Sequence, residues 1–382
     1  MVDLPRGKQL SADERSAANV LLHLVRLSHE VATRPDVWGI AIYAVASDAD
    51  EPALLDERLA AESGFEGVAC VDDVARAAVL ALRQYELEGE PLALKLAERW
   101  LSFVEYMQLA DGRFCNFILG WTGRRNEAGI TSIPGGGWWT ARALWALGLA
   151  YRVTGKQHYR RAFKRGWTTG LPLAADISAI MLLGTLDYLR RSRDRTLEVE
   201  ARVMANHIAQ TTVDGYLVHH PGEASIHMWG YEQVTALVAA SNYFHEPAYL
   251  EPCISTAELV FRRHALEGPY RDFPGRAQCG LCAYDVSCCC RGLAALHDAT
   301  GDSRYAEWFF RLIEWFDGRN GNGRPLYHRG EGRCHDGIDG GQLNPNCGAE
   351  SAIEAGFVEL ERRRLLRDRQ PKRRRPHGRP AA

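Results

Sequence analysis

The chain has 382 residues, of which 46% are hydrophobic and 25% are charged, a composition that suits one large globular domain or two ordinary ones. Residues 362–382 hold ten Arg and Lys residues and one acid. Subtracting these from the 46 basic and 48 acidic residues of the chain leaves 36 and 47, so the body carries a charge of about −11, which excludes a nucleic-acid-binding body.

The sequence shows no segment that would place the chain in or across a membrane. No apolar run approaches the roughly 18 residues that a bilayer span requires. Residues 1–8 have no apolar stretch behind their charges, so no secretory signal is expected and a cytoplasmic location is predicted. In a reducing cytoplasm, most of the ten cysteines should be buried thiols and not disulfides.

Hydrophobic periodicity predicts a mostly helical chain with few strands. The predicted helices cover residues 11–34, 72–87, 91–108, 138–153, 157–168, 173–190, 194–210, 231–244, 248–265, 284–299, 302–317 and 347–365.

These helices are of two kinds. Segment 91–108 carries charged side chains such as Lys95 and Glu98 on one face and apolar ones such as Trp100 and Val104 on the other. Such a pattern indicates a helix with one side in solvent. Segment 138–153 is apolar on nearly all sides, which indicates a helix that is buried all round.

The two kinds alternate in a degenerate repeat of about 35–65 residues, which favours a closed or stacked helical array. Several amphipathic helices end in an acid–glycine step such as Asp111-Gly112, where glycine suits the left-handed backbone of a helix end. We therefore predict one all-α domain over residues 11–365, an (α/α)6 toroid, followed by a disordered basic tail over 366–382. An open helical solenoid is the alternative.

In the toroid, the inner helices begin near residues 72, 138, 173, 231, 284 and 347, and helix 11–34 is the outer partner of the last one. All long loops precede inner helices, so they should gather on one face and line one cavity. Aromatic rings and hydrogen-bonding groups at these positions suit a polyhydroxylated ligand. The predicted substrate-binding residues are Trp138, Trp139, His227, Trp229, Tyr231, Tyr284, Asp285, His335, Asp339 and Asn346.

Carboxylates at the same mouth are the predicted catalytic groups. Asp72 and Asp73 open the first inner helix, and Asp336 and Glu350 lie in the glycine-rich loop and helix start that close the chain. Cleavage of a glycosidic bond typically requires two carboxyl groups, one protonated and one ionised. We favour Asp73 and Asp336, because the first and last inner helices are neighbours in a closed ring. Capping of the helix dipole is the competing explanation for Asp72 and Asp73.

Two arginines, Arg76 and Arg142, lie one turn inside buried helices and are expected to pair with acids of the loops, since a buried unpaired charge is costly. A zinc site built from Cys282, Cys334 and His335 is an alternative use of the cysteine-rich region near Cys279. The consecutive Cys288, Cys289 and Cys290 cannot all face one ion on a helix. Inert thiols are the preferred interpretation, so no metal and no cofactor are expected.

Four stretches resemble the six-hairpin glycosidase-like proteins, in particular a bacterial group found beside or fused to glycosyltransferases. They are Cys70-Val-Asp-Asp-Val-Ala-Arg-Ala77, Asp111-Gly-Arg-Phe-Cys-Asn-Phe117, Arg142-Ala-Leu-Trp-Ala-Leu-Gly148, and the closing loop with Gly348-Ala-Glu-Ser351. The resemblance implies a toroid and a carbohydrate-active protein, with a glycosyltransferase as a partner. A non-catalytic glycan-binding scaffold is the alternative to a glycoside hydrolase.

One stretch departs from that group's pattern. The group often carries Ser-Glu-Asp-x-x-Gly before the Arg-Ala-Leu-Trp run, whereas residues 134–141 here read Pro-Gly-Gly-Gly-Trp-Trp-Thr-Ala. The carboxylates of that motif are therefore missing from this chain, and any catalytic pair must come from other positions.

Overall fold

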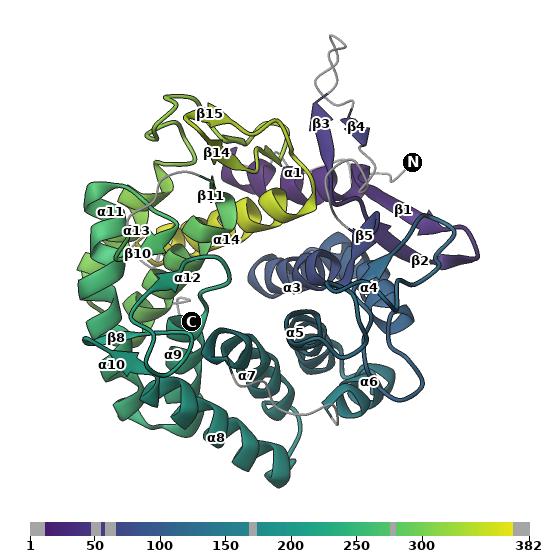
Figure 1. The fold of residues 1–382 in the computed structure, drawn as a ribbon, viewed down its shortest axis with the longest axis horizontal. Coiled ribbons are helices and arrows are strands. Elements are labelled where there is room, and N and C mark those ends of the chain that lie inside the picture. Colours follow the sequence, from purple (N-terminus) through teal and green to yellow (C-terminus); the bar gives the residue numbers. More distant parts are fainter. Residues whose placement is uncertain (1–11, 47–54, 58–65, 168–173, 276–279, 370–382) are drawn as a thin grey trace, which may run out of the picture.

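The computed structural model describes residues 12–46, 55–57, 66–167, 174–275 and 280–369. Within these residues, six helices form an inner ring, and Figure 1 shows outer helices packed around it. The inner helices are α3 (Val71–Glu88), α5 (Gly137–Thr154), α7 (Ala175–Leu189), α9 (Gln233–Phe244), α12 (Ala283–Thr300) and α14 (Ala349–Arg369). Each packs against the next, and α14 packs against α3. The ring is therefore closed, as predicted, and the open solenoid is wrong.

The outer ring pairs one helical segment with each inner helix. It contains α4 (Pro91–Tyr106), α6 (Gln157–Trp167), α8 (Arg195–Gln210), α13 (Ser303–Ile313) and α1 (Ala12–Arg26), and α1 packs against α14 as predicted. The outer segment beside α9 is not one regular helix but a succession of 3-10, α, π and α turns, namely η1 (Pro247–Tyr249), α10 (Leu250–Thr256), η2 (Ala257–Phe261) and α11 (Arg262–Glu267).

The predicted helix 11–34 is wrong in its last third. Helix α1 ends at Arg26, and the chain continues as an antiparallel hairpin of β1 (Ser28–Val31) and β2 (Arg34–Ile40). Pro35 has no backbone N–H to donate within a helix. Val37 and Ile40 are instead buried, with β2 packed against α4. Tertiary packing of these buried residues decides this segment over helix propensity.

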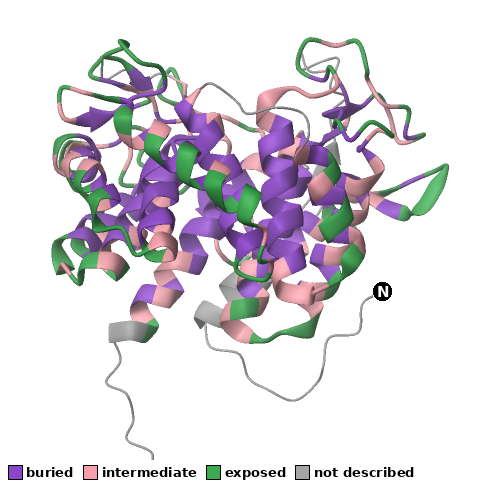
Figure 2. Cartoon of the chain, turned by 90° about the horizontal axis from the view of Figure 1, so that it is seen from below, coloured by how far each residue is buried: buried purple, intermediate pink, exposed green. Residues whose placement is uncertain are grey.

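Short strand pairs hold the loops at the mouth of the ring, and Figure 2 shows loops and strands gathered at one end of the buried helices. Strand β5 (Ala69–Cys70) pairs with β6 (Phe117–Ile118), and β9 (Ile226–His227) with β10 (Asp272–Phe273). A three-stranded sheet orders β11 (Leu281–Cys282), β14 (Gly337–Asp339) and β15 (Gln342–Leu343). The remaining pairs are β3 (Ala44–Ala46) with β4 (Leu55–Glu57), β7 (Thr212–Val213) with β8 (Tyr216–Leu217), and β12 (Tyr327–His328) with β13 (Arg333–Cys334).

Inner helices α5 and α7 approach closely through two glycines. A Cβ on Gly148 would meet the carbonyl oxygen of Gly184, and a Cβ on Gly184 would meet the backbone of Trp145. Larger side chains at either position would push the two helices apart. None of the described helices is long and apolar enough to cross a membrane.

Helix α14 continues to Arg369, beyond the expected domain end at residue 365, and residues 370–382 lie outside the described residues. We expect that a chain ending after Arg369 melts at the same temperature as the full chain, because the arginines and prolines that follow bury little apolar area. A chain ending after Arg364 should melt several degrees lower, because it lacks Leu365, which is 1% exposed, and the contact of Arg367 with Leu87. Differential scanning calorimetry of the three chains checks this, and equal losses in both shortened chains would contradict it.

Candidate active site

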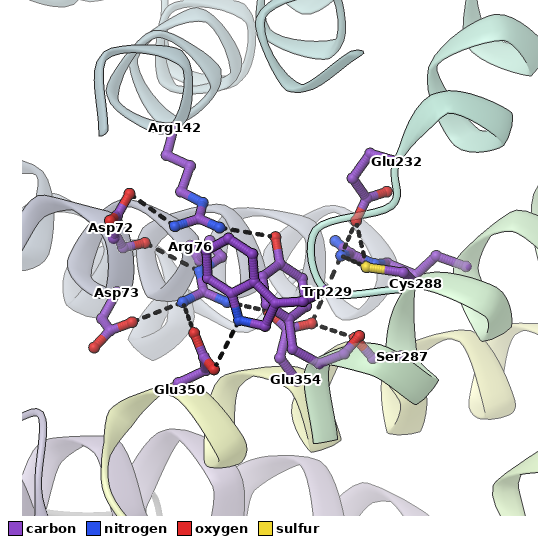
Figure 3. Close-up of polar contacts among 12 residues, drawn as sticks. Asp72, Asp73, Arg76, Arg142, Trp229, Glu232, Ser287, Cys288, Glu350 and Glu354 are labelled. Carbon is purple, nitrogen blue, oxygen red and sulfur yellow. Dashed lines mark hydrogen bonds and ion pairs between the residues drawn. The ribbon is translucent and has the colours of Figure 1, made fainter. Parts of the chain in front are cut away.

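Arg76 lies at the centre of the carboxylates that the inner helices bring to the mouth (Figure 3). Its guanidinium is 0% exposed, and Nη2 lies 2.7 Å from Asp73 Oδ1 and 2.8 Å from Glu350 Oε2. Nη1 lies 2.6 Å from Glu354 Oε1. Arg76 therefore joins the first inner helix, α3, to the last, α14. It pairs with acids as predicted, but these acids lie in the two helices and not in the loops.

Arg142 makes the same kind of link between α5 and α3. Its Nη1 lies 2.8 Å from Asp72 Oδ1, and the guanidinium is 4.8 Å from the ring centre of Trp229. Asn116, from the Asp111–Phe117 motif, accepts from the backbone N–H of Asp72 at 3.1 Å and donates to Asp72 Oδ2 at 3.1 Å. Asp72 is thus held on two sides by partners from other segments, which goes beyond what a helix cap alone would need.

The ionic network continues from α14 into α12 and to the start of α9 (Figure 3). Glu354 Oε2 accepts a hydrogen bond from Ser287 and lies 3.6 Å from Arg291 Nη2. Arg291 also pairs with Glu232, the residue before α9. Through Arg76, Arg142 and Arg291, five of the six inner helices or their starts are connected by buried charges.

Carboxylates outnumber guanidiniums in this network. Three arginines face five acids, namely Asp72, Asp73, Glu232, Glu350 and Glu354. Burial disfavours ionised carboxylates, and neighbouring like charges add to that effect. Burial raises the pKa of Asp73 to about 6 against the opposing effect of Arg76, with Glu350 and Asp72 contributing to the rise. Asp73, 3% exposed, therefore changes its protonation near neutral pH.

The closing loop brings Asp336 to the same cluster. The Asp336 N–H donates to the carbonyl of Asn346 at 2.8 Å, and its own carbonyl accepts from Ala283, the first residue of α12, at 2.9 Å. A Cβ on Gly337 would meet the backbone of Leu281 and Cys282, so this close approach requires glycine. Burial, followed by the charge of Glu350, raises the pKa of Asp336 to about 7.

Asp285 is a third carboxyl with a raised pKa, but it has a structural partner. Its Oδ2 accepts from the backbone N–H of Cys282 at 2.8 Å, as part of the capping box that begins α12. Burial raises its pKa to about 7. Asp285 therefore caps the start of α12. Its contact with a ligand stays a prediction.

The predicted aromatic residues divide into two groups. Trp138 and Trp229 are partly buried, with ring centres 5.0 Å apart in a T-shaped contact, and the Trp229 indole N–H donates to Glu350 Oε1 at 3.2 Å. Trp139, 7% exposed, donates to the carbonyl of Phe114 at 2.8 Å. Tyr231 and Tyr284 are fully buried. Trp138 and Trp229 are thus the rings that keep exposed surface, whereas the other three belong to the core.

The remaining predicted binding residues lie around this cluster. The ring nitrogens of His335 face the Asn344 carbonyl at 2.9 Å and Arg333 at 3.3 Å. The exposed Asp339 accepts from Asn344 at 2.9 Å, so both side chains are engaged within the closing loop. Asn346 accepts from Ala44 at 3.1 Å and from Gly348 at 3.2 Å and bonds Asp336. His227 lies elsewhere on the rim, beside Asp176.

The nine described cysteines are all free, and eight of them are buried, which confirms the expectation of buried thiols for these positions. Cys279 lies outside the described residues. Burial raises the pKa of the Cys282 and Cys334 thiols well above the ordinary value. Among the described residues, the group whose ligating atoms converge is Asp176, His219 and His227, so Cys282, Cys334 and His335 do not form the alternative zinc site.

Sequence reasoning missed Glu354 and did not assign Tyr43 to the cluster. Glu354 lies four residues after Glu350 in a helix that is otherwise buried, and an acid in such a helix signals a buried partner. Tyr43 lies in a loop before β3, and burial with the charges of Asp336 and Asp73 raises its pKa. No local pattern at Tyr43 indicates this position.

A cavity of about 550 Å³ lies between α11, α13 and the closing loop, with His264, Arg311 and Trp315 in its lining. None of the clustered carboxylates lines this cavity. It is therefore separate from the site at the mouth of the ring.

No protein-family model and no curated protein matches the chain. Solved structures do match its fold. A cellobiose 2-epimerase from Bacillus thermoamylovorans has a TM-score of 0.71 at 11% identity, covering 92% of this chain and 98% of that one. A sugar epimerase from a ruminal bacterium has a TM-score of 0.69 at 10% identity, covering 92% and 98%.

An α-1,6-mannanase of glycoside hydrolase family 76 from a Salegentibacter species has a TM-score of 0.58 at 13% identity, covering 93% of this chain and 100% of that one. That structure is an inactive variant, with asparagine in place of two consecutive aspartates, in complex with α-1,6-mannotriose. These likenesses show that the chain has the six-hairpin glycosidase-like (α/α)6 toroid fold.

Proposed function

We propose that this protein is a carbohydrate-active enzyme that hydrolyses a glycosidic bond in an oligo- or polysaccharide. The observation that carries the proposal is that two carboxyls with raised pKa values, Asp73 and Asp336, lie near enough for the charge of Asp73 to act on Asp336, beside the ionic cluster and the rings of Trp138 and Trp229. Sugars stack on such rings and hydrogen-bond to carboxylates. Sugar epimerases and a mannanase among the structures of the same fold support a sugar as the ligand.

The two carboxyls have different surroundings and therefore different roles in this proposal. Asp336 has the higher pKa, about 7, and pairs with no arginine or lysine among the described residues, so it supplies the proton to the leaving oxygen. Asp73 faces Arg76, which favours its ionised form, so it acts as the base or nucleophile. Asp72 and Glu350 hold Arg142, Arg76 and Trp229 in place. The consecutive aspartates replaced in the inactive mannanase are a parallel for Asp72 and Asp73.

A screen of disaccharides and oligosaccharides tests the proposal, with α-1,6-mannotriose and cellobiose as first substrates and product analysis by chromatography and NMR. Release of smaller sugars supports hydrolysis. A change of sugar configuration without cleavage assigns an epimerase instead. Binding on a glycan array without turnover assigns a non-catalytic scaffold, for which a glycosyltransferase partner is then the next protein to test.

We expect kcat/KM for the substrate found to follow a bell-shaped pH dependence with its maximum between about pH 6 and 7. Activity should fall below about pH 6, as Asp73 takes up a proton, and above about pH 7, as Asp336 loses one. The apparent pKa values of the acidic and alkaline limbs of this profile describe Asp73 and Asp336 as an interacting pair and not as isolated groups. Melting temperatures over the same range serve as the control for unfolding, and a profile that is flat between pH 5 and 8 would contradict the assignment.

A further inference from the structure

A second group of polar side chains lies on the rim between α7 and α9, outside the ionic cluster. Asp176 is in the first turn of α7, His219 follows β8, and His227 is in β9. Asp176 Oδ2 lies 3.2 Å from His219 Nδ1 and 3.9 Å from His227 Nε2. The ligating atoms of all three lie within 4.8 Å of one another. The mechanism proposed above uses none of these residues as acid or base.

Both imidazoles have their second nitrogen next to a backbone carbonyl. His219 Nε2 lies 3.0 Å from the carbonyl of His227, and His227 Nδ1 lies 2.9 Å from the carbonyl of Trp229. An N–H at each of these positions would donate to the carbonyl and leave the opposite nitrogen with a lone pair toward Asp176. This orientation by a backbone carbonyl is what metal-binding histidines usually show.

The separations also suit a small cation. Ligands about 2.0–2.1 Å from a tetrahedral zinc ion lie about 3.4 Å from one another. The two distances from Asp176, 3.2 and 3.9 Å, lie on either side of that value. Asp176 and His219 are buried, whereas the His227 side chain is 40% exposed, so one side of the site opens to the rim.

Gln233 is a further polar side chain beside this group. It is fully buried, its amide nitrogen lies 3.2 Å from His219 Nδ1, and its Oε1 has no hydrogen-bond partner among the described residues. A half-turn of the terminal amide exchanges its nitrogen and oxygen. Oε1 would then lie beside His219 Nδ1. An amide oxygen is a ligand that divalent cations accept.

We infer that Asp176, His219 and His227 bind a divalent transition-metal ion, with an open position that faces the rim of the ring. Two imidazoles and one carboxylate suit zinc and its neighbours in the first transition row. The site differs from the cysteine-based one considered from the sequence, and it departs from the expectation that no metal is bound. Through Trp229, whose carbonyl faces His227 and whose indole donates to Glu350, the metal would be linked to the carboxylate cluster.

Without a metal, His219 Nδ1–H would donate to Asp176, and Nε2 would accept from the N–H of His227, 3.1 Å away. A metal ion at this point replaces that proton.

The test uses the full chain, stripped of metal by a chelator and titrated with Zn²⁺ by calorimetry and with Co²⁺ by visible absorption. We expect one equivalent of Zn²⁺ to bind and to raise the melting temperature. Co²⁺ should give the visible bands of a four- or five-coordinate site without the strong near-ultraviolet band of thiolate ligands. His227→Gln should weaken binding roughly 100-fold or more, since it removes an imidazole that would bind the metal directly. His220→Gln is the matched control, because His220 is exposed and adjacent to His219.

Less than half an equivalent bound to the full chain, a thiolate band with Co²⁺, or equal affinities of His227→Gln and His220→Gln would each overturn the inference. Asp176→Asn provides a second ligand variant. If it does not fold, His227→Gln decides the matter alone, since that side chain is partly exposed. Metal content and spectra do not depend on turnover. The metal site can therefore be tested even if the proposed sugar hydrolysis is not found.

Discussion

Replacing Arg76 with methionine is expected to lower the free energy of unfolding by about 3–5 kcal/mol, the usual cost of breaking a buried ion pair from one side. The guanidinium is fully buried and lies within 2.8 Å of Asp73, Glu350 and Glu354. Methionine fills a similar volume but leaves Asp73 and Glu350 without a positive partner among the described residues, and leaves Glu354 with Arg291 alone, 3.6 Å away. Urea denaturation at pH 7.5 measures the effect.

Two further variants separate the charge effect from packing. Arg99→Met removes an exposed arginine of α4 and should change stability by about 0.5 kcal/mol or less. Glu354→Gln in the Arg76→Met background removes a buried charge that has lost its pairing with Arg76. This second change should recover part of the lost stability. Equal stability of Arg76→Met and the wild type would show that the ionic cluster does not hold the inner ring together.

Asp73→Asn and Asp336→Asn are each expected to lower kcat by about 100- to 10,000-fold on the substrate found in the screen, the usual range for an acid or base. Both changes are nearly isosteric. Melting temperatures should change little, because each removes a carboxylate that burial already disfavours. Steady-state kinetics with circular dichroism of each variant checks this expectation.

Asp111→Asn is the matched control for both variants. Asp111 is an exposed carboxylate in the turn after α4, where it pairs with Arg113. Its loss should leave kcat unchanged. If Asp73→Asn and Asp336→Asn retain full turnover, the assignment is wrong, and Asp72, Asp285 and Asp339 become the next carboxyls to replace. If both unfold, their role is structural.

The ring architecture could be predicted because the two helix types differ in the sequence itself. Segment 138–153 has no polar face, and α5 is indeed buried on nearly all sides. The hairpin after Arg26 could not be predicted in this way, since its strands form only against α4. Likewise, the breaks in the outer segment beside α9 have no clear signature in residues 248–265.

The part of the candidate site that could be predicted is the set of residues that lie at or just before the starts of the inner helices. Asp72, Asp73, Asp336 and Glu350 were expected at one mouth, and the structure brings them together around Arg76. Sequence could not tell that Trp139, Tyr231 and Tyr284 point into the core, because side-chain direction at a helix start depends on neighbouring helices. Nor could it join Asp176, in helix α7, with His219, in the loop after β8, and His227, in strand β9.

The most direct test of the central claim is turnover of α-1,6-mannotriose, cellobiose and a wider oligosaccharide set by the wild type and by Asp336→Asn, followed by NMR. The account predicts that the wild type releases smaller sugars from at least one of them, and that Asp336→Asn binds the same sugar but releases at least about 100-fold less per unit time. Cleavage at equal rates by both proteins would contradict it, as would binding of a sugar by the wild type without any change in that sugar.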